Sequence, residues 1–188
     1  MVSFMAWPPD LGYTHHMDIG RQLAYTENAR RQLRETLTTH PETLDVTFET
    51  TAAHKTIGQL VAHLIGAEKR WTSGRLYAEG TPPRYEDAAA STREGLFADW
   101  DEIRARTLEF AARADAAMLG RVIATDLPQW GAQVRLTAEE VLLHVCNHQT
   151  WHTGQISMAL QRLGVDPPNF DYVFLRDDEG EPEEAEKS

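Results

Sequence analysis

The chain has 188 residues, of which 41% are hydrophobic and 25% charged, a composition that predicts one soluble globular domain. Its net charge of −11 and its lack of a basic stripe exclude a phosphate-neutralising nucleic-acid surface and argue against binding to anionic membranes. No apolar run approaches the roughly 20 residues that span a bilayer, Met1–Trp7 lacks a signal-peptide pattern, and the one cysteine, Cys146, excludes an intrachain disulfide, so we expect a cytoplasmic protein.

Two amphipathic helices are predicted in the first half of the chain. The first is expected over Thr14–Thr39, and Arg30 interrupts its apolar face, so this side chain must pair or extend to solvent. The second is expected to begin at Thr56, since Thr56 and Gln59 have the spacing of a capping box. Gly80, followed by two prolines, is expected to end it.

A third helix is predicted next, and it is followed by a change of pattern. Ser91 and Glu94 have capping-box spacing at its start, and Gly120 is expected to end it. Short β-compatible runs then occupy Arg121–Leu136, with Pro128–Gly131 as a turn between them. This stretch predicts a small hairpin or an extended loop.

The fourth helix is predicted over Thr137–Leu163, with Glu140 completing a capping box. The aromatic segment Asn169–Leu175 is expected to pack back on the body, whereas residues 176–188, which carry seven acids and two bases, are expected to be disordered. Four amphipathic helices predict an all-α domain over residues 1–175, a four-helix bundle. Its long first and third connections permit up-down-down-up topology.

The fourth helix carries a pair of histidines, His148 and His152, that could chelate a metal ion. A four-residue step returns within about 40° on an α-helix, so the two imidazoles project one turn apart from one face. Val145 lies on the same arc, so we expect the pair to face the core, where a shared metal would satisfy both rings. The alternative is two packed, hydrogen-bonded core histidines. Gln149 follows His148, so the general base of the zinc proteases is missing.

His63, in the middle of the second helix, is the best candidate for a third ligand. His144 is expected at the rim of the site, and His54, before the helix cap, is less constrained. The histidines near the ends of the first helix are expected to face solvent: His15, His16 and His40. Three imidazoles leave a coordination position open, and such ligands suit zinc or nickel, with iron, manganese or copper as further candidates.

Two segments resemble the DinB-like family of metal-dependent proteins: Val145–Ile156, which contains both histidines of the pair, and Thr56–Trp71, which contains His63. The resemblance implies a four-helix bundle, a homodimer, and a metal ion bound by three histidines that correspond to His63, His148 and His152. Relatives include isomerases and S-transferases that use low-molecular-weight thiols such as mycothiol or bacillithiol. One departure is Thr153, where the family commonly has an arginine.

The leading functional hypothesis is a divalent-metal enzyme in which the three-histidine site activates a thiol or water, of S-transferase or hydrolase type. A low-molecular-weight thiol or another small molecule would be its substrate. The alternative is a non-catalytic, stress-related binding module with a structural metal. A third reading has no metal. The sequence identifies no general base.

Overall fold

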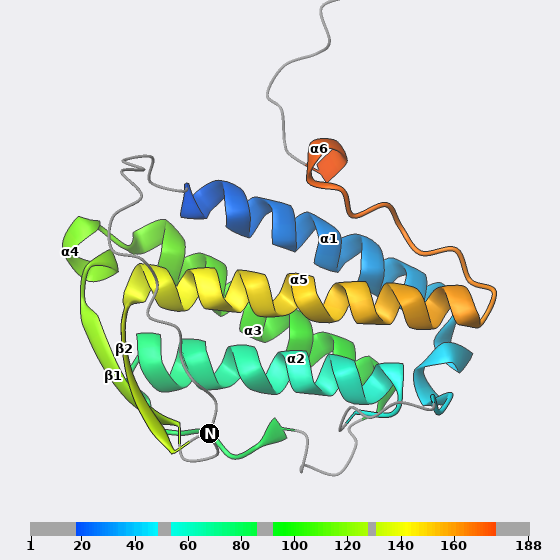
Figure 1. Cartoon of the computed structure of the whole chain (residues 1–188), viewed down its shortest axis with the longest axis horizontal. Helices are drawn as coiled ribbons and strands as arrows, with labels where there is room; N and C mark the ends of the chain where they lie inside the picture. The colour runs from blue at the N-terminus through cyan, green and yellow to red at the C-terminus, as the bar shows by residue number, and fades with distance from the viewer. Residues whose placement is uncertain (1–17, 49–53, 86–91, 128–130, 176–188) are drawn as a thin grey trace, which may run out of the picture.

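A computed structural model describes residues 18–48, 54–85, 92–127 and 131–175. This part of the chain is mostly helical and contains one two-stranded sheet (Figure 1). None of its helices combines the length and apolarity needed to cross a bilayer. The elements are α1 (Ile19–Thr39), the 3-10 helix η1 (Pro41–Asp45), α2 (Ile57–Trp71), the π-helix η2 (Thr72–Leu76), α3 (Arg93–Arg113), α4 (Ala116–Leu119), β1 (Val122–Leu127), β2 (Ala132–Thr137), α5 (Ala138–Arg162) and α6 (Tyr172–Leu175).

The four long helices α1, α2, α3 and α5 lie side by side (Figure 1). Glu68 of α2 bonds Arg104 of α3, and Thr72, the first residue of η2 directly after α2, bonds Thr107 of α3. Helices α2 and α3 therefore run in the same direction. By the colour sequence of Figure 1, α1 and α5 run the opposite way. The directions are therefore up, down, down, up, the order that the long connections permit.

The start of the first helix differs from the prediction. Helix α1 begins at Ile19 rather than Thr14, because the Asp18 carboxylate accepts hydrogen bonds from the backbone N–H groups of Gly20 and Arg21 and caps the helix there. Residues 14–17 lie outside the described residues.

The third helix also has other bounds than predicted. Thr92, whose side chain accepts from the Gly95 N–H, caps α3, while Ser91 lies outside the described residues. The helix ends at Arg113 rather than at Gly120, because Ala114 adopts an extended conformation. The Asp115 side chain then caps the separate short helix α4.

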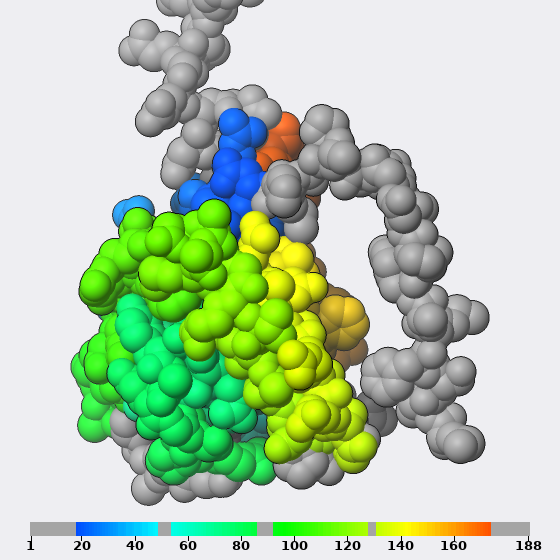
Figure 2. All heavy atoms as spheres, turned by 90° about the vertical axis from the view of Figure 1, so that its left-hand side faces the viewer, coloured from blue at the N-terminus to red at the C-terminus, as the bar shows by residue number. Residues whose placement is uncertain are grey.

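The capping boxes predicted at Thr56 and Thr137 are both present, and they start α2 and α5. The predicted hairpin is also present, as strands β1 and β2 with Val122 opposite Thr137, although residues 128–130 of its turn lie outside the described residues. In the end-on view of Figure 2, the hairpin and α4 cover one end of the helices. The hairpin therefore closes that end of the core.

The C-terminal segment packs against α1 as expected. The Tyr25 hydroxyl donates a hydrogen bond of 2.8 Å to the Phe170 carbonyl, and the rings of Tyr25 and Tyr172 lie 5.2 Å apart. The acidic stretch 176–188, which the sequence predicts to be disordered, lies outside the described residues.

The main hydrophobic core lies between the four long helices, around the fully buried Trp100. Every one of these helices contributes apolar side chains to it: Leu33 and Leu37 from α1, Ile57, Leu60, Val61, Leu64 and Ile65 from α2, Phe97 and Ile103 from α3, and Ile156, Ala159 and Leu160 from α5. Burying this surface is the main contribution to the stability of the fold.

A buried charged network crosses the same interior. Arg104 of α3, only 1% exposed, donates to Glu27 at 3.2 Å, to Glu68 at 3.3 Å and to the hydroxyl of Thr26. Arg30 pairs with Glu27, which is the partner that its position on the apolar face requires. Glu68 is buried in this network, where Arg104 compensates its charge.

We expect Arg104→Ala to lower the free energy of unfolding by about 3–5 kcal/mol, because it leaves the buried Glu68 carboxylate without its cation. Urea unfolding followed by circular dichroism measures this. Arg113→Ala is the matched control, since Arg113 is exposed and pairs with Glu109 on its own helix. This control should change stability by less than about 1 kcal/mol. Equal effects of the two substitutions would contradict the assignment.

Candidate metal centre

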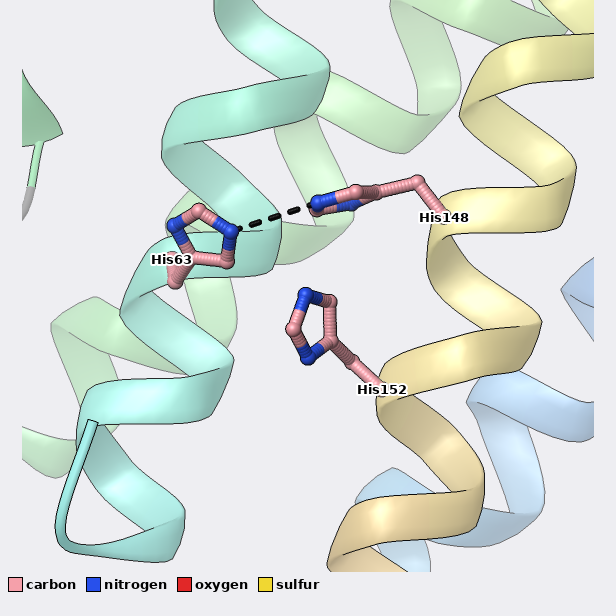
Figure 3. A group of neighbouring side chains, drawn as sticks. All are labelled: His63, His148 and His152. Atoms are coloured by element: carbon pink, nitrogen blue, oxygen red, sulfur yellow. Dashed lines mark hydrogen bonds between the residues drawn. The ribbon is translucent and has the colours of Figure 1, made fainter. Parts of the chain in front are cut away.

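Three imidazoles converge between α2 and α5. His63 projects from the middle of α2, and His148 and His152 project from successive turns of α5 toward it (Figure 3). The side-by-side packing of the two helices places the single histidine opposite the pair. The structure therefore brings together the three side chains that the sequence singled out.

The spacing of the ring nitrogens fits a shared ion. The Nε2 atoms of His63 and His148 are 3.2 Å apart, and one nitrogen from each of the three rings lies within 4.8 Å of the others. Zn–N bonds of 2.0–2.1 Å in a tetrahedral site place two ligand nitrogens about 3.3 Å apart. The first pair already has this separation, and a small movement of His152 would complete the set.

Gln155 orients the third imidazole. Its side-chain oxygen lies 2.7 Å from Nδ1 of His152, one turn further along α5. A carbonyl oxygen can only accept, so this contact requires the proton on Nδ1 and leaves the lone pair of Nε2 directed away from Gln155. Metal-binding histidines typically have such a partner on the other ring nitrogen.

The histidines lie nearer the surface than the sequence predicts. All three rings are half-buried, whereas the fully buried side of α5 includes Cys146, Gln149 and Thr153. Helix α5 contacts both α1 and α2, so the side between these two neighbours is enclosed and the histidines lie at its edge, facing α2. The pair therefore faces α2 at the edge of the core rather than at its centre.

The surroundings of His148 and His152 favour the neutral form of the imidazole, which is the form that binds a metal ion. Burial, then the neighbouring imidazoles and Arg70, lower the pKa of His148 to about 3. Burial also lowers the pKa of His152, although its bond to Gln155 acts in the opposite direction. Burial likewise lowers the pKa of His144. A metal ion binds the neutral imidazole, so these shifts keep the ligands available at mildly acidic pH.

Two further imidazoles border the site. The His54 ring lies 4.3 Å from that of His63, and the His144 ring lies 5.8 Å from that of His148 and 4.7 Å from that of Trp71. His144 is thus at the rim, as expected. The contact of His54 was not predicted, because His54 precedes the cap of α2 and no helical periodicity relates it to His63.

The fold and the site define a mostly helical protein with a group of three histidines able to hold one metal ion. The model of the DinB family matches residues 14–186, so the chain belongs to the DinB family, and the resemblance seen in its two histidine segments is confirmed. The structure is similar to a crystal structure of a DinB-like protein, YjoA, from Bacillus subtilis, with a TM-score of 0.55 and 14% identity over 80% of this chain and 97% of that chain. A search of curated proteins found no match.

We expect Gln155→Ala to weaken zinc binding about 10- to 100-fold, because the His152 ring would lose the acceptor that fixes its tautomer and orientation. Competition with a chromophoric chelator measures the affinity. Gln161→Ala, an exposed position on the same helix, is the control and should leave it unchanged. An unchanged affinity in Gln155→Ala would show that the contact does not orient a ligand.

The low pKa of His148 also predicts a pH dependence of the metal-free protein. Below pH 6.5 the unfolded chain binds a proton at this residue that the folded chain excludes down to about pH 3. Stability therefore falls as the pH drops below about 6.5. Between pH 7 and pH 5, the free energy of unfolding measured in urea should fall less in His148→Gln than in the wild type. The two slopes against pH should differ by an amount that corresponds to up to about one bound proton. Parallel curves for the two proteins would contradict this.

Proposed function

We propose that His63, His148 and His152 bind one divalent metal ion, zinc or nickel first, with iron, manganese or copper as further candidates. The observation that carries the proposal is the convergence of three half-buried imidazoles from two helices, with two Nε2 atoms 3.2 Å apart. Imidazole nitrogen donors suit zinc, nickel, iron and copper, whereas manganese prefers oxygen ligands. The hydrogen bond that His152 Nδ1–H donates to Gln155 and the low pKa of His148 support the same assignment.

We infer an enzyme of S-transferase or hydrolase type. Bound at three protein ligands, such an ion keeps an exchangeable position and lowers the pKa of a ligated water to about 7, or deprotonates a bound thiol. The half-exposure of the three rings supports substrate access, whereas the alternative of a structural metal requires an enclosed ion. The substrate would be a low-molecular-weight thiol or another small molecule.

The residues around the site support separate roles. The three histidines hold and position the reacting centre, and Gln155 fixes the orientation of His152. Glu68 is a poor general base, because its carboxylate is buried, paired with Arg104 and hydrogen-bonded by Thr107. The His54 ring lies beside His63, with ring centroids 4.3 Å apart, at the edge of the site.

We further propose that the four long helices form the four-helix bundle of the family, within a domain over residues 1–175, and that the protein is a cytoplasmic homodimer. Two large apolar side chains on the outer face of α5 support a dimer: Trp151 is 70% exposed and Met158 65% exposed. They are two helical turns apart on one face, and such exposed apolar side chains mark protein contacts.

Metal analysis of purified variants tests the proposal. We expect about one ion per chain in the wild type, and a loss of most of it in each of His63→Ala, His148→Ala and His152→Ala, because two imidazoles bind far more weakly than three. His40→Ala is the matched control, since the His40 side chain lies at the surface near Glu42. It should retain the full content.

The exchangeable coordination position of the proposed metal ion is tested on cobalt-loaded protein. Addition of 2-mercaptoethanol should produce a thiolate-to-metal charge-transfer absorption in the wild type and in His40→Ala. Full metal content in all three site variants would overturn the metal site. A normal metal content without any spectral response to thiol or to pH would leave the site structural, which is the alternative reading.

A further inference from the structure

A cavity lies on the face of α5 next to the one that carries the histidines. It has a volume of about 220 Å³ and is enclosed by α1, α5 and the C-terminal segment. Gln149 and Thr153, each one residue after a proposed metal ligand, line it, so α5 has the two sites on neighbouring faces. Ala29 of α1 contributes only a methyl group to the opposite wall, which leaves the space open.

Two side chains that line the cavity have buried polar atoms without partners. Gln149 is 3% exposed; its amide nitrogen donates to the Thr26 carbonyl at 2.8 Å, whereas its Oε1 atom has no hydrogen-bond partner within the described part of the chain. The Oγ1 atom of Thr153, 4% exposed, also has none among those residues. An unsatisfied buried polar atom is unfavourable, so a ligand that reaches these atoms after a small movement of the two side chains gains affinity.

The rest of the cavity wall is aromatic and negatively charged. Tyr25 and Phe170 form two sides and are held together by the hydrogen bond from the Tyr25 hydroxyl to the Phe170 carbonyl. Asp171, exposed, adds a carboxylate at the rim. Burial raises the pKa of Tyr25, and the charge of Asp171 raises it further.

We propose that this cavity binds a small organic cation, an ammonium group on an aromatic or apolar body. The amide oxygen of Gln149 can only accept hydrogen bonds, and the carboxylate of Asp171 attracts a positive charge. Aromatic faces such as those of Tyr25 and Phe170 attract a cation and pack against an apolar ring. An anion would be repelled by the Asp171 carboxylate and by the overall charge of −11.

Benzylamine is the probe, because it combines a ring with a protonated amine at neutral pH. Titration of the full ¹⁵N-labelled chain should shift amide signals of α1, α5 and residues 170–171 around the cavity. Benzyl alcohol, of the same shape but uncharged, should bind at least about tenfold more weakly, since it lacks the charge-assisted hydrogen bond. Equal affinity for the two probes, no binding, or tighter binding of benzoate would overturn the proposal.

Three variants make the test specific. Asp171→Asn should weaken benzylamine binding about tenfold, and Thr153→Val, of the same shape, should weaken it several-fold. Asp166→Asn, an exposed carboxylate of the same segment that does not line the cavity, is the control and should bind like the wild type. Unchanged binding in both cavity variants, with unchanged melting temperatures, would overturn the site.

Binding of the amine in the cavity does not require a metal ion at the three histidines. The titration is repeated on chelator-treated protein and on His148→Ala, where the affinity for benzylamine should be unchanged. A loss of benzylamine binding in these samples would place the amine on the metal or its ligands and overturn the cavity site, whereas metal analysis alone decides the three-histidine proposal.

Discussion

The register between α2 and α5 is the constraint on which the candidate metal centre depends. An α-helix rises 5.4 Å per turn, so a slide of one turn between the two helices would carry the His63 and His148 nitrogens, now 3.2 Å apart, beyond the reach of one shared ion. Apolar side chains of both helices meet in the same core, and α2 is in addition fixed to α3 by the pair of Glu68 and Arg104. The packing and the buried charges together hold the imidazoles in range before any ion binds.

Much of this arrangement follows from short-range features of the sequence. The capping boxes at Thr56 and Thr137 depend on residues three positions apart, so the starts of α2 and α5 could be predicted from the residues alone. The same holds for His148 and His152, whose spacing alone places them one turn apart. The prediction of His63 as the third ligand had weaker support, because it depended only on the position of His63 on the apolar side of another helix.

Features that depend on long-range contacts were not predictable in this way. The burial of Glu68 requires Arg104 from another helix, and the contact between His54 and His63 requires the path of the chain before a helix cap. The end of α3 at Arg113 was also missed, because apolar periodicity continues beyond the point where Ala114 becomes extended. The half-exposure of the histidines follows from which neighbours flank α5, and a helical wheel of one segment does not contain that information.

Thr137 belongs to two elements at once. It is the last residue of β2, paired with Val122, and its hydroxyl caps α5 by accepting from the Glu140 N–H, while the next backbone N–H, that of Ala138, donates to the Arg121 carbonyl. Separating the strands would therefore also unwind the first turn of the helix that contains both histidines of the pair. The hairpin and the start of α5 form one cooperative unit of local unfolding. Its opening would loosen the N-terminal end of α5 while the core between the long helices stays intact.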